Sequence, residues 1–287
     1  MFSFVLLCLA SRFFYSLNDV FTGRLARKYD RIEVAALRGV SLGLTMAPLL
    51  LFVPARAWAS LRAELPLLLA IVTLTAVANI LALQSARYLP FGVRASLITT
   101  ATSLVSLGLG VMVLGERLTL LAFLLCALIV GSAVVAALGE HASHEIEPKL
   151  ARGALLASAS GFAMALVALW MKRLATSTHP LLAAWAWEFG AGGILVVPAL
   201  LRGVRWSGWR RFGGVTLASS PTVLGSGASI LALQAGQLGL WGALAGTQVL
   251  FTAALGVLWH REAMGARRWA CFALASAGLA GLALFRR

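Results

Sequence analysis

The chain has 287 residues, of which 60% are hydrophobic and only 12% are charged, against about a quarter charged in ordinary soluble domains. Lys plus Arg number 24 and Asp plus Glu number 10, which gives a formal net charge of +14. A soluble fold of this length could not keep so much apolar surface from water, and disordered chains are poor in apolar residues. The composition indicates a polytopic helical membrane protein. In so apolar a chain, the excess of Lys and Arg indicates how the loops are oriented across the membrane, and no nucleic-acid partner is expected.

Ten apolar segments are long enough to be transmembrane helices, because a bilayer core of about 30 Å needs roughly 20 helical residues. Barrel strands would appear as short alternating segments, a pattern that this sequence lacks. We therefore expect an all-α integral membrane protein of ten helices, in a bacterial inner (plasma) membrane. In chain order the expected helices span residues 2–22, 33–53, 66–86, 90–114, 118–138, 153–171, 180–201, 213–234, 238–259 and 266–285.

The two halves of the chain resemble each other. The segment ASRF at residues 10–13 matches ASGF at 159–162, and LALQ at 81–84 recurs at 231–234, at offsets of about 149 and 150. The matches define a first repeat over 1–139, a polar linker over 140–152 and a second repeat over 153–287. Because each copy holds five helices, an odd number, consecutive copies must cross the membrane in opposite directions. The sequence predicts two inverted five-helix repeats with a substrate site near the midplane between them, a plan that serves alternating access.

A family resemblance rests on the segment LPFGVRASLITTATSLVSLGLGVMVLGERLTLLAFLLCALIVGSAVV and on the five-plus-five arrangement. Both resemble the EamA-type members of the drug/metabolite transporter (DMT) superfamily, over essentially the full length. The second copy departs from the pattern, with HREAM at 260–264 in place of GERLT at 115–119. The resemblance implies a transporter of amino acids, sugars, nucleotide sugars or other metabolites, and names no single substrate.

Basic loop residues divide unevenly between the two faces of the expected membrane domain. Loops after odd-numbered helices hold about 14 Lys and Arg residues, against about 7 on the opposite face. Since cytoplasmic loops carry the excess of positive charge, this count places both termini outside the cytoplasm. The family resemblance implies cytoplasmic termini, so the sequence leaves the orientation open.

The first helix carries charge at membrane depth, where an arginine costs about 2.5–3.5 kcal/mol on insertion scales. Arg12 lies near the helix midpoint and Asp19 two turns later, with Tyr15 and Asn18 between them. At about 1.5 Å rise per residue, the two charges are about 10 Å apart along the axis, so direct pairing would be strained. An anionic substrate group is therefore one candidate partner for Arg12. The alternative is a structural ion pair, with Asp19 across a bend or with Glu188 from another helix.

The fourth and ninth helices carry uncharged polar residues in register. Thr102 matches Gln248 and Ser106 matches Thr252, and each helix presents its pair at i, i+4, hence on one face. Asn79 adds a polar group slightly past the middle of the third helix. These five residues predict a polar cavity for a small solute. Hydrogen bonding between helices, commonly worth about 1 kcal/mol or less per contact in membranes, is the alternative.

Five positions have expected roles in helix bending, helix capping or ion coupling. Pro221 removes a backbone hydrogen bond in the eighth helix and predicts a hinge, with simple close packing as the alternative. Glu116 and Glu262 end equivalent helices, where pairing or capping of the following turn is expected. Asp19 and Glu188 are the candidates for carrying a coupling ion.

The leading hypothesis is a secondary transporter or facilitator that moves a small polar metabolite, amino-acid-like or another organic solute, by alternating access. Its expected partners are that small-molecule substrate and the lipid bilayer, and a monomer is sufficient. The alternative is a translocator of a lipid-linked or amphipathic substrate, with a cavity open to lipid. An intramembrane enzyme is a remote alternative, since its acid–base pair would have to be Asp19 and Glu188 from different helices. The sequence has no phosphate-binding loop or convincing metal cluster, so no cofactor or metal is expected.

Overall fold

The computed structural model describes residues 2–89, 91–138, 148–203, 208–260 and 265–284. Every regular element within these residues is helical, and the core is all-α. In chain order the elements are α1 (Phe2–Lys28), α2 (Arg31–Met46), the 3-10 helix η1 (Ala47–Phe52), α3 (Ala55–Ala63), α4 (Leu65–Ser85), α5 (Phe91–Met112), α6 (Leu120–Leu138), α7 (Pro148–Ser177), α8 (Pro180–Leu201), α9 (Gly208–Ala235), α10 (Leu238–Ala245), α11 (Gln248–His260) and α12 (Ala266–Leu284).

Among the described residues, seven helices are long and apolar enough to cross a bilayer: α1, α2 with η1, α4, α5, α7, α8 and α9. Shorter apolar segments lie within α6, at Leu120–Ile129, and across α10 and the start of α11, at Leu238–Thr252. The expectation of ten uniform spans is therefore met only in part. The short helix α3 was not expected; it buries Ala57 and Leu61 and, with nine residues, is too short to span a membrane.

The largest departure from the expected helices is a break in the segment 238–259. Gly246 and Thr247 separate α10 from α11, and their N–H groups bond to carbonyls three residues back, at Ala243 and Leu244. The Thr247 hydroxyl also donates to the Leu244 carbonyl, at 2.7 Å. Glycine is a weak helix former and a threonine side chain competes for backbone groups, so both favour an interruption at this point. By contrast, α9 continues through Pro221 as one helix without such a break.

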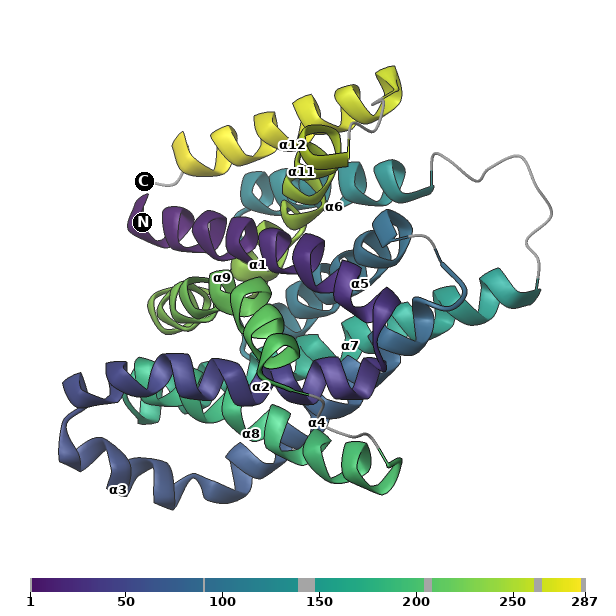
Figure 1. Cartoon of the computed structure of the whole chain (residues 1–287). Coiled ribbons are helices and arrows are strands. Elements are labelled where there is room, and N and C mark those ends of the chain that lie inside the picture. The colour runs from purple at the N-terminus through teal and green to yellow at the C-terminus, as the bar shows by residue number, and fades with distance from the viewer. Residues whose placement is uncertain (1, 90, 139–147, 204–207, 261–264, 285–287) are drawn as a thin grey trace.

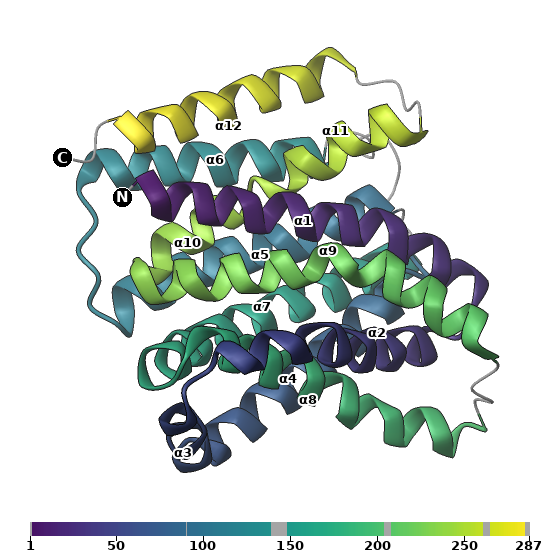
Figure 2. The same ribbon diagram turned by 60° about the vertical axis from the view of Figure 1, so that its left-hand side comes forward.

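The helices form an interleaved bundle rather than two separate halves (Figures 1 and 2). Helices α6 and α12 pack together along one edge, and α2 packs with α8 toward the opposite edge beside α3 and α4. Between these edges α1 lies against α9, while α4 and α5 lie against α7. Each of these central contacts joins one repeat to the other. The core is therefore built from both copies.

The first helices of the two repeats, α1 and α7, run in opposite directions. Phe4, at the start of α1, abuts Gly236, and Lys172, near the end of α7, donates to the Gly236 carbonyl at 2.8 Å. The start of α1 and the end of α7 therefore share one end of the bundle, here called the Gly236 end. The other end, called the Asp30 end, holds the α1–α2 and α4–α5 turns and the start of α7, where Gly153 abuts Tyr88 (Figure 2).

Glu116 joins three helices at the Gly236 end. Its Oε1 accepts from Lys172 Nζ at 2.8 Å and from the Leu238 N–H at 2.6 Å, and its Oε2 accepts from the Gly239 N–H at 2.8 Å. Since α10 begins at Leu238, the carboxylate satisfies two of the N–H groups that a helix start leaves unbonded. This is the pairing and capping role expected for Glu116. Its counterpart Glu262, and residues 140–147 of the expected linker, lie outside the described residues.

Replacing Glu116 with alanine should lower the stability of the detergent-purified protein by about 2 kcal/mol or more, because two backbone N–H groups and a half-buried ammonium group lose their acceptor. Differential scanning fluorimetry measures the fall in Tm. Glu64→Ala is the matched control, since Glu64 precedes α4 with no side-chain capping bond. Equal Tm values for the two variants would contradict the role given to Glu116.

Candidate functional site

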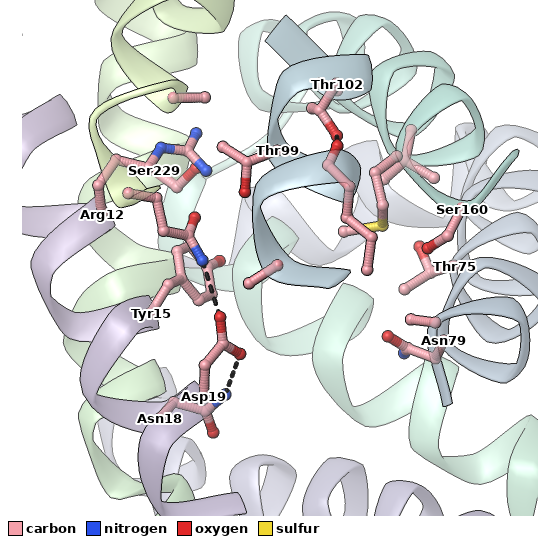
Figure 3. A pocket seen from close by; sticks show the side chains of 18 of the residues that line it. Arg12, Tyr15, Asn18, Asp19, Thr75, Asn79, Thr99, Thr102, Ser160 and Ser229 are labelled. Carbon is pink, nitrogen blue, oxygen red and sulfur yellow. Dashed lines mark hydrogen bonds between the residues drawn. The ribbon is translucent and has the colours of Figure 1, made fainter. Parts of the chain in front are cut away.

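A cavity of about 250 Å³ lies between the two repeats. It is lined by α1, α2, α4 and α5 of the first repeat and by α7 to α11 of the second (Figure 3). Toward the Asp30 end the lining includes Leu83 and Arg94, which are partly exposed. Toward the Gly236 end it consists of the buried side chains of Met171, Leu233 and Trp241. The cavity therefore opens toward the Asp30 end and has an apolar floor at the Gly236 end.

Arg12 is a buried charge in the cavity wall, at 6% exposed. Its guanidinium carbon lies 4.3 Å from the Trp241 ring centroid and 5.8 Å from that of Tyr15. Aromatic faces attract a cation but do not neutralise it. Nε and Nη2 have no hydrogen-bond partner, and no carboxylate pairs with Arg12 within the described part of the chain. The structural ion pair left open by the sequence is therefore not formed.

Asp19 is held by amides instead of by Arg12. Its Oδ2 accepts from Gln248 Nε2 at 2.9 Å and its Oδ1 from Asn18 Nδ2 at 3.4 Å (Figure 3). Arg94, at the start of α5, also interacts electrostatically with this carboxylate. Because Gln248 is the first residue of α11, the bond ties α1 to the helix that follows the break.

Glu188 is held by an ion pair and a hydroxyl. Its Oε2 lies 3.5 Å from Arg38 Nη2, and its Oε1 accepts from Ser226 Oγ at 2.6 Å. The same Ser226 hydroxyl lies 3.0 Å from the Tyr15 hydroxyl. Four helices, α1, α9, α8 and α2, are thereby connected in one polar chain. Arg38 and Glu188 occupy equivalent positions of the two repeats, so the pair joins the copies directly.

The cavity wall opposite α1 carries neutral polar groups (Figure 3). The Thr102 hydroxyl lies within hydrogen-bonding distance of two backbone carbonyls, those of Ile98 at 2.8 Å and Gly161 at 3.1 Å. Asn79 and Thr99, in contrast, form no side-chain hydrogen bond within the described residues. These residues can therefore offer an amide and a hydroxyl to a bound solute, and they carry no charge themselves.

The residues expected to bind substrate divide into two sets. Ser106 and Thr252 lie outside the lining, in contacts between helices: Ser106 packs beside Gly242, and Thr252 Oγ1 lies 3.2 Å from Ser16 Oγ. Pro221 is also outside the lining. The expected residues that do line the cavity are Arg12, Tyr15, Asn18, Asp19, Asn79, Thr102, Glu188 and Gln248.

Arg94 and Trp241 were not anticipated as site residues, and Arg38 was not given a site role. A signal for the arginines was present in the sequence. Of the 24 Lys and Arg residues, all but Arg12, Arg38 and Arg94 lie in or near the expected loops, and these three all line the cavity. The sequence gave no comparable signal for Trp241. A tryptophan in a membrane helix can face lipid, another helix or a cavity, and its residue type alone does not distinguish these positions.

The direction in which the cavity opens can be tested by thiol labelling. Ala82→Cys, in the partly exposed lining of α4, should react readily with a membrane-impermeant maleimide in detergent, because water reaches this position. Ala232→Cys, fully buried in α9, is the control and should stay unlabelled. The native Cys8, Cys126 and Cys271 are buried and give a low background. Equal labelling rates at the two positions would contradict the proposed opening.

Comparisons with known proteins agree with this architecture. The profile of the EamA-like transporter family matches the chain twice, over residues 2–138 and 151–284. A solved crystal structure superposes with a TM-score of 0.80 at 17% sequence identity, covering 99% of this chain and 97% of that one. This likeness concerns the fold. A search of curated proteins finds no match in sequence.

Proposed function

Because the chain belongs to the EamA-like transporter family of the DMT superfamily, we propose that it is a secondary transporter or facilitator. It moves a small polar metabolite, amino-acid-like or another organic solute, across a bacterial inner membrane by alternating access. The observation that carries the proposal is Arg12, a buried guanidinium with two N–H-bearing nitrogens unbonded, in a cavity that both repeats line. An anionic group of the solute binds there.

Alternating access requires the Gly236 end to open when the Asp30 end closes. The contacts that seal the Gly236 end are the apolar floor and the bonds of Glu116 to Lys172 and to the start of α10. The break at Gly246 lets α10 move with this seal while α11 stays bonded to Asp19 through Gln248. Two inverted copies of one unit can exchange conformations in this way.

Asp19 is the better candidate of the two carboxylates for a coupling proton. Its direct hydrogen-bond donors, Gln248 and Asn18, are neutral amides, and both can rotate to present an oxygen to a protonated acid. Protonation of Glu188 would disrupt its 3.5 Å ion pair with Arg38, which joins the two repeats directly. We assign Asp19 to coupling, and Glu188 to holding the repeats together.

Arg12→Gln should reduce solute flux in proteoliposomes at least about tenfold, since it removes the charge that binds the anionic group. The solute is first chosen by a thermal-shift screen of metabolites on the purified protein, because a ligand stabilises the state that it binds. Arg56→Gln, the same change on the exposed face of α3, is the matched control. Unchanged flux in a well-folded Arg12→Gln protein would remove Arg12 from the binding site.

Asp19→Asn should abolish the dependence of flux on a pH gradient while leaving equilibrium binding of the solute largely intact, because asparagine keeps the shape and loses the titratable proton. The measurement compares flux with and without an imposed gradient in the same vesicles. A gradient dependence that persists in Asp19→Asn would exclude Asp19 from coupling.

A further inference from the structure

The positive and negative side chains that line the cavity are unequal in number. Five charged side chains contribute to the described lining: the guanidinium groups of Arg12, Arg38 and Arg94, and the carboxylates of Asp19 and Glu188. Three positive and two negative groups leave one positive charge in excess. The hydrogen bonds and ion pairs of the five groups show which side chain carries this excess charge.

Both carboxylates already have partners. Glu188 is paired with Arg38 and accepts from Ser226. Asp19 accepts from Gln248 and Asn18, and the positive charges of Arg94 and Arg38 act on its carboxylate. An ammonium group on a solute would have to displace one of these partners. Charged groups at membrane depth are costly to leave unpaired, so such a displacement is unfavourable. The cavity therefore offers a cation no carboxylate that is free of other donors.

The excess positive charge is on Arg12. Its guanidinium rests on the Trp241 ring at 4.3 Å, with Nε and Nη2 unbonded. A planar guanidinium binds a carboxylate through two parallel hydrogen bonds, and Nε with one Nη group is a common edge for this contact. The contact with the face of the Trp241 ring leaves that edge unbonded.

The rest of the cavity suits an uncharged body. Asn79, Thr99 and Ser229 line it and form no side-chain hydrogen bond within the described residues, so they can bond neutral polar groups. Met171 and Leu233, in the apolar floor, can bury hydrocarbon. These neutral and apolar surfaces provide no compensation for a second charge of either sign.

We propose that the cavity selects solutes of net charge −1: one carboxylate-type group bound by Arg12, on an otherwise uncharged and partly apolar body. The inference rests on the proposed function in treating the cavity as the substrate site. It excludes the zwitterion of the same skeleton as a preferred solute. A zwitterion would bring an ammonium group for which both carboxylates are already engaged.

The test compares two probes that differ in one group. 2-Hydroxy-4-methylpentanoate and leucine share a carbon skeleton and a carboxylate, and carry a hydroxyl or an ammonium group at the same carbon. Isothermal titration calorimetry of the full chain in detergent at pH 7 should give at least tenfold tighter binding of the hydroxy acid. Arg12→Gln should remove this preference by weakening hydroxy-acid binding, and Arg56→Gln should preserve it.

Equal or tighter binding of leucine, no saturable binding of either probe, or a preference that survives Arg12→Gln would each overturn the inference. If Arg12→Gln does not fold, Arg12→Lys replaces it. This change keeps the charge and loses the planar two-bond contact, so hydroxy-acid affinity should fall while the preference remains.

Flux of both probes in proteoliposomes separates this inference from the proposed function. Selective binding without flux contradicts transport alone, and equal flux of both probes contradicts the charge rule alone.

Discussion

The buried charge of Arg12 is the constraint from which the properties of the site follow. A guanidinium at membrane depth is costly without a partner, and the two carboxylates that line the cavity have other partners. The indole face of Trp241 supplies part of the stabilisation, but it leaves the hydrogen-bonding edge free. Arg12 is therefore a buried cation between the two halves of the protein, without a carboxylate partner among the described residues.

The inverted repeats form a shared cavity but not a symmetric one. Gly161 occupies in α7 the position that Arg12 occupies in α1, and a Cβ at Gly161 would overlap the Ile98 carbonyl of α5. The second copy uses this position for close helix packing, and the first copy uses it for charge. The difference between the repeats therefore separates a charged, cavity-lining position on α1 from a packing contact on α7.

The two ends of the cavity are held by different physical means. At the Gly236 end, buried apolar side chains and the Glu116 carboxylate bind α10 to α5 and α7. Toward the Asp30 end, the lining is partly exposed and contains Arg38 and Arg94. Helix α10 ends at a break beside Gly246, so the seal can move without unfolding α11. In the proposed alternating access, this break lets the seal at the Gly236 end move while α11 stays in place.

Composition and internal repetition were sufficient to predict a helical membrane protein of two related halves, because the bilayer imposes apolar helices of fixed minimum length. They also identified the polar face of α1, since charge inside an apolar span is conspicuous. The sequence could not decide which polar residues share a cavity: Thr102 and Gln248 line it, whereas Ser106 and Thr252, one turn away, lie in helix contacts. Nor could it show that Asp19 bonds Gln248 and leaves Arg12 unpaired. Those outcomes depend on the rotation of each helix and on partners about 150 residues or more away, which the tertiary packing alone determines.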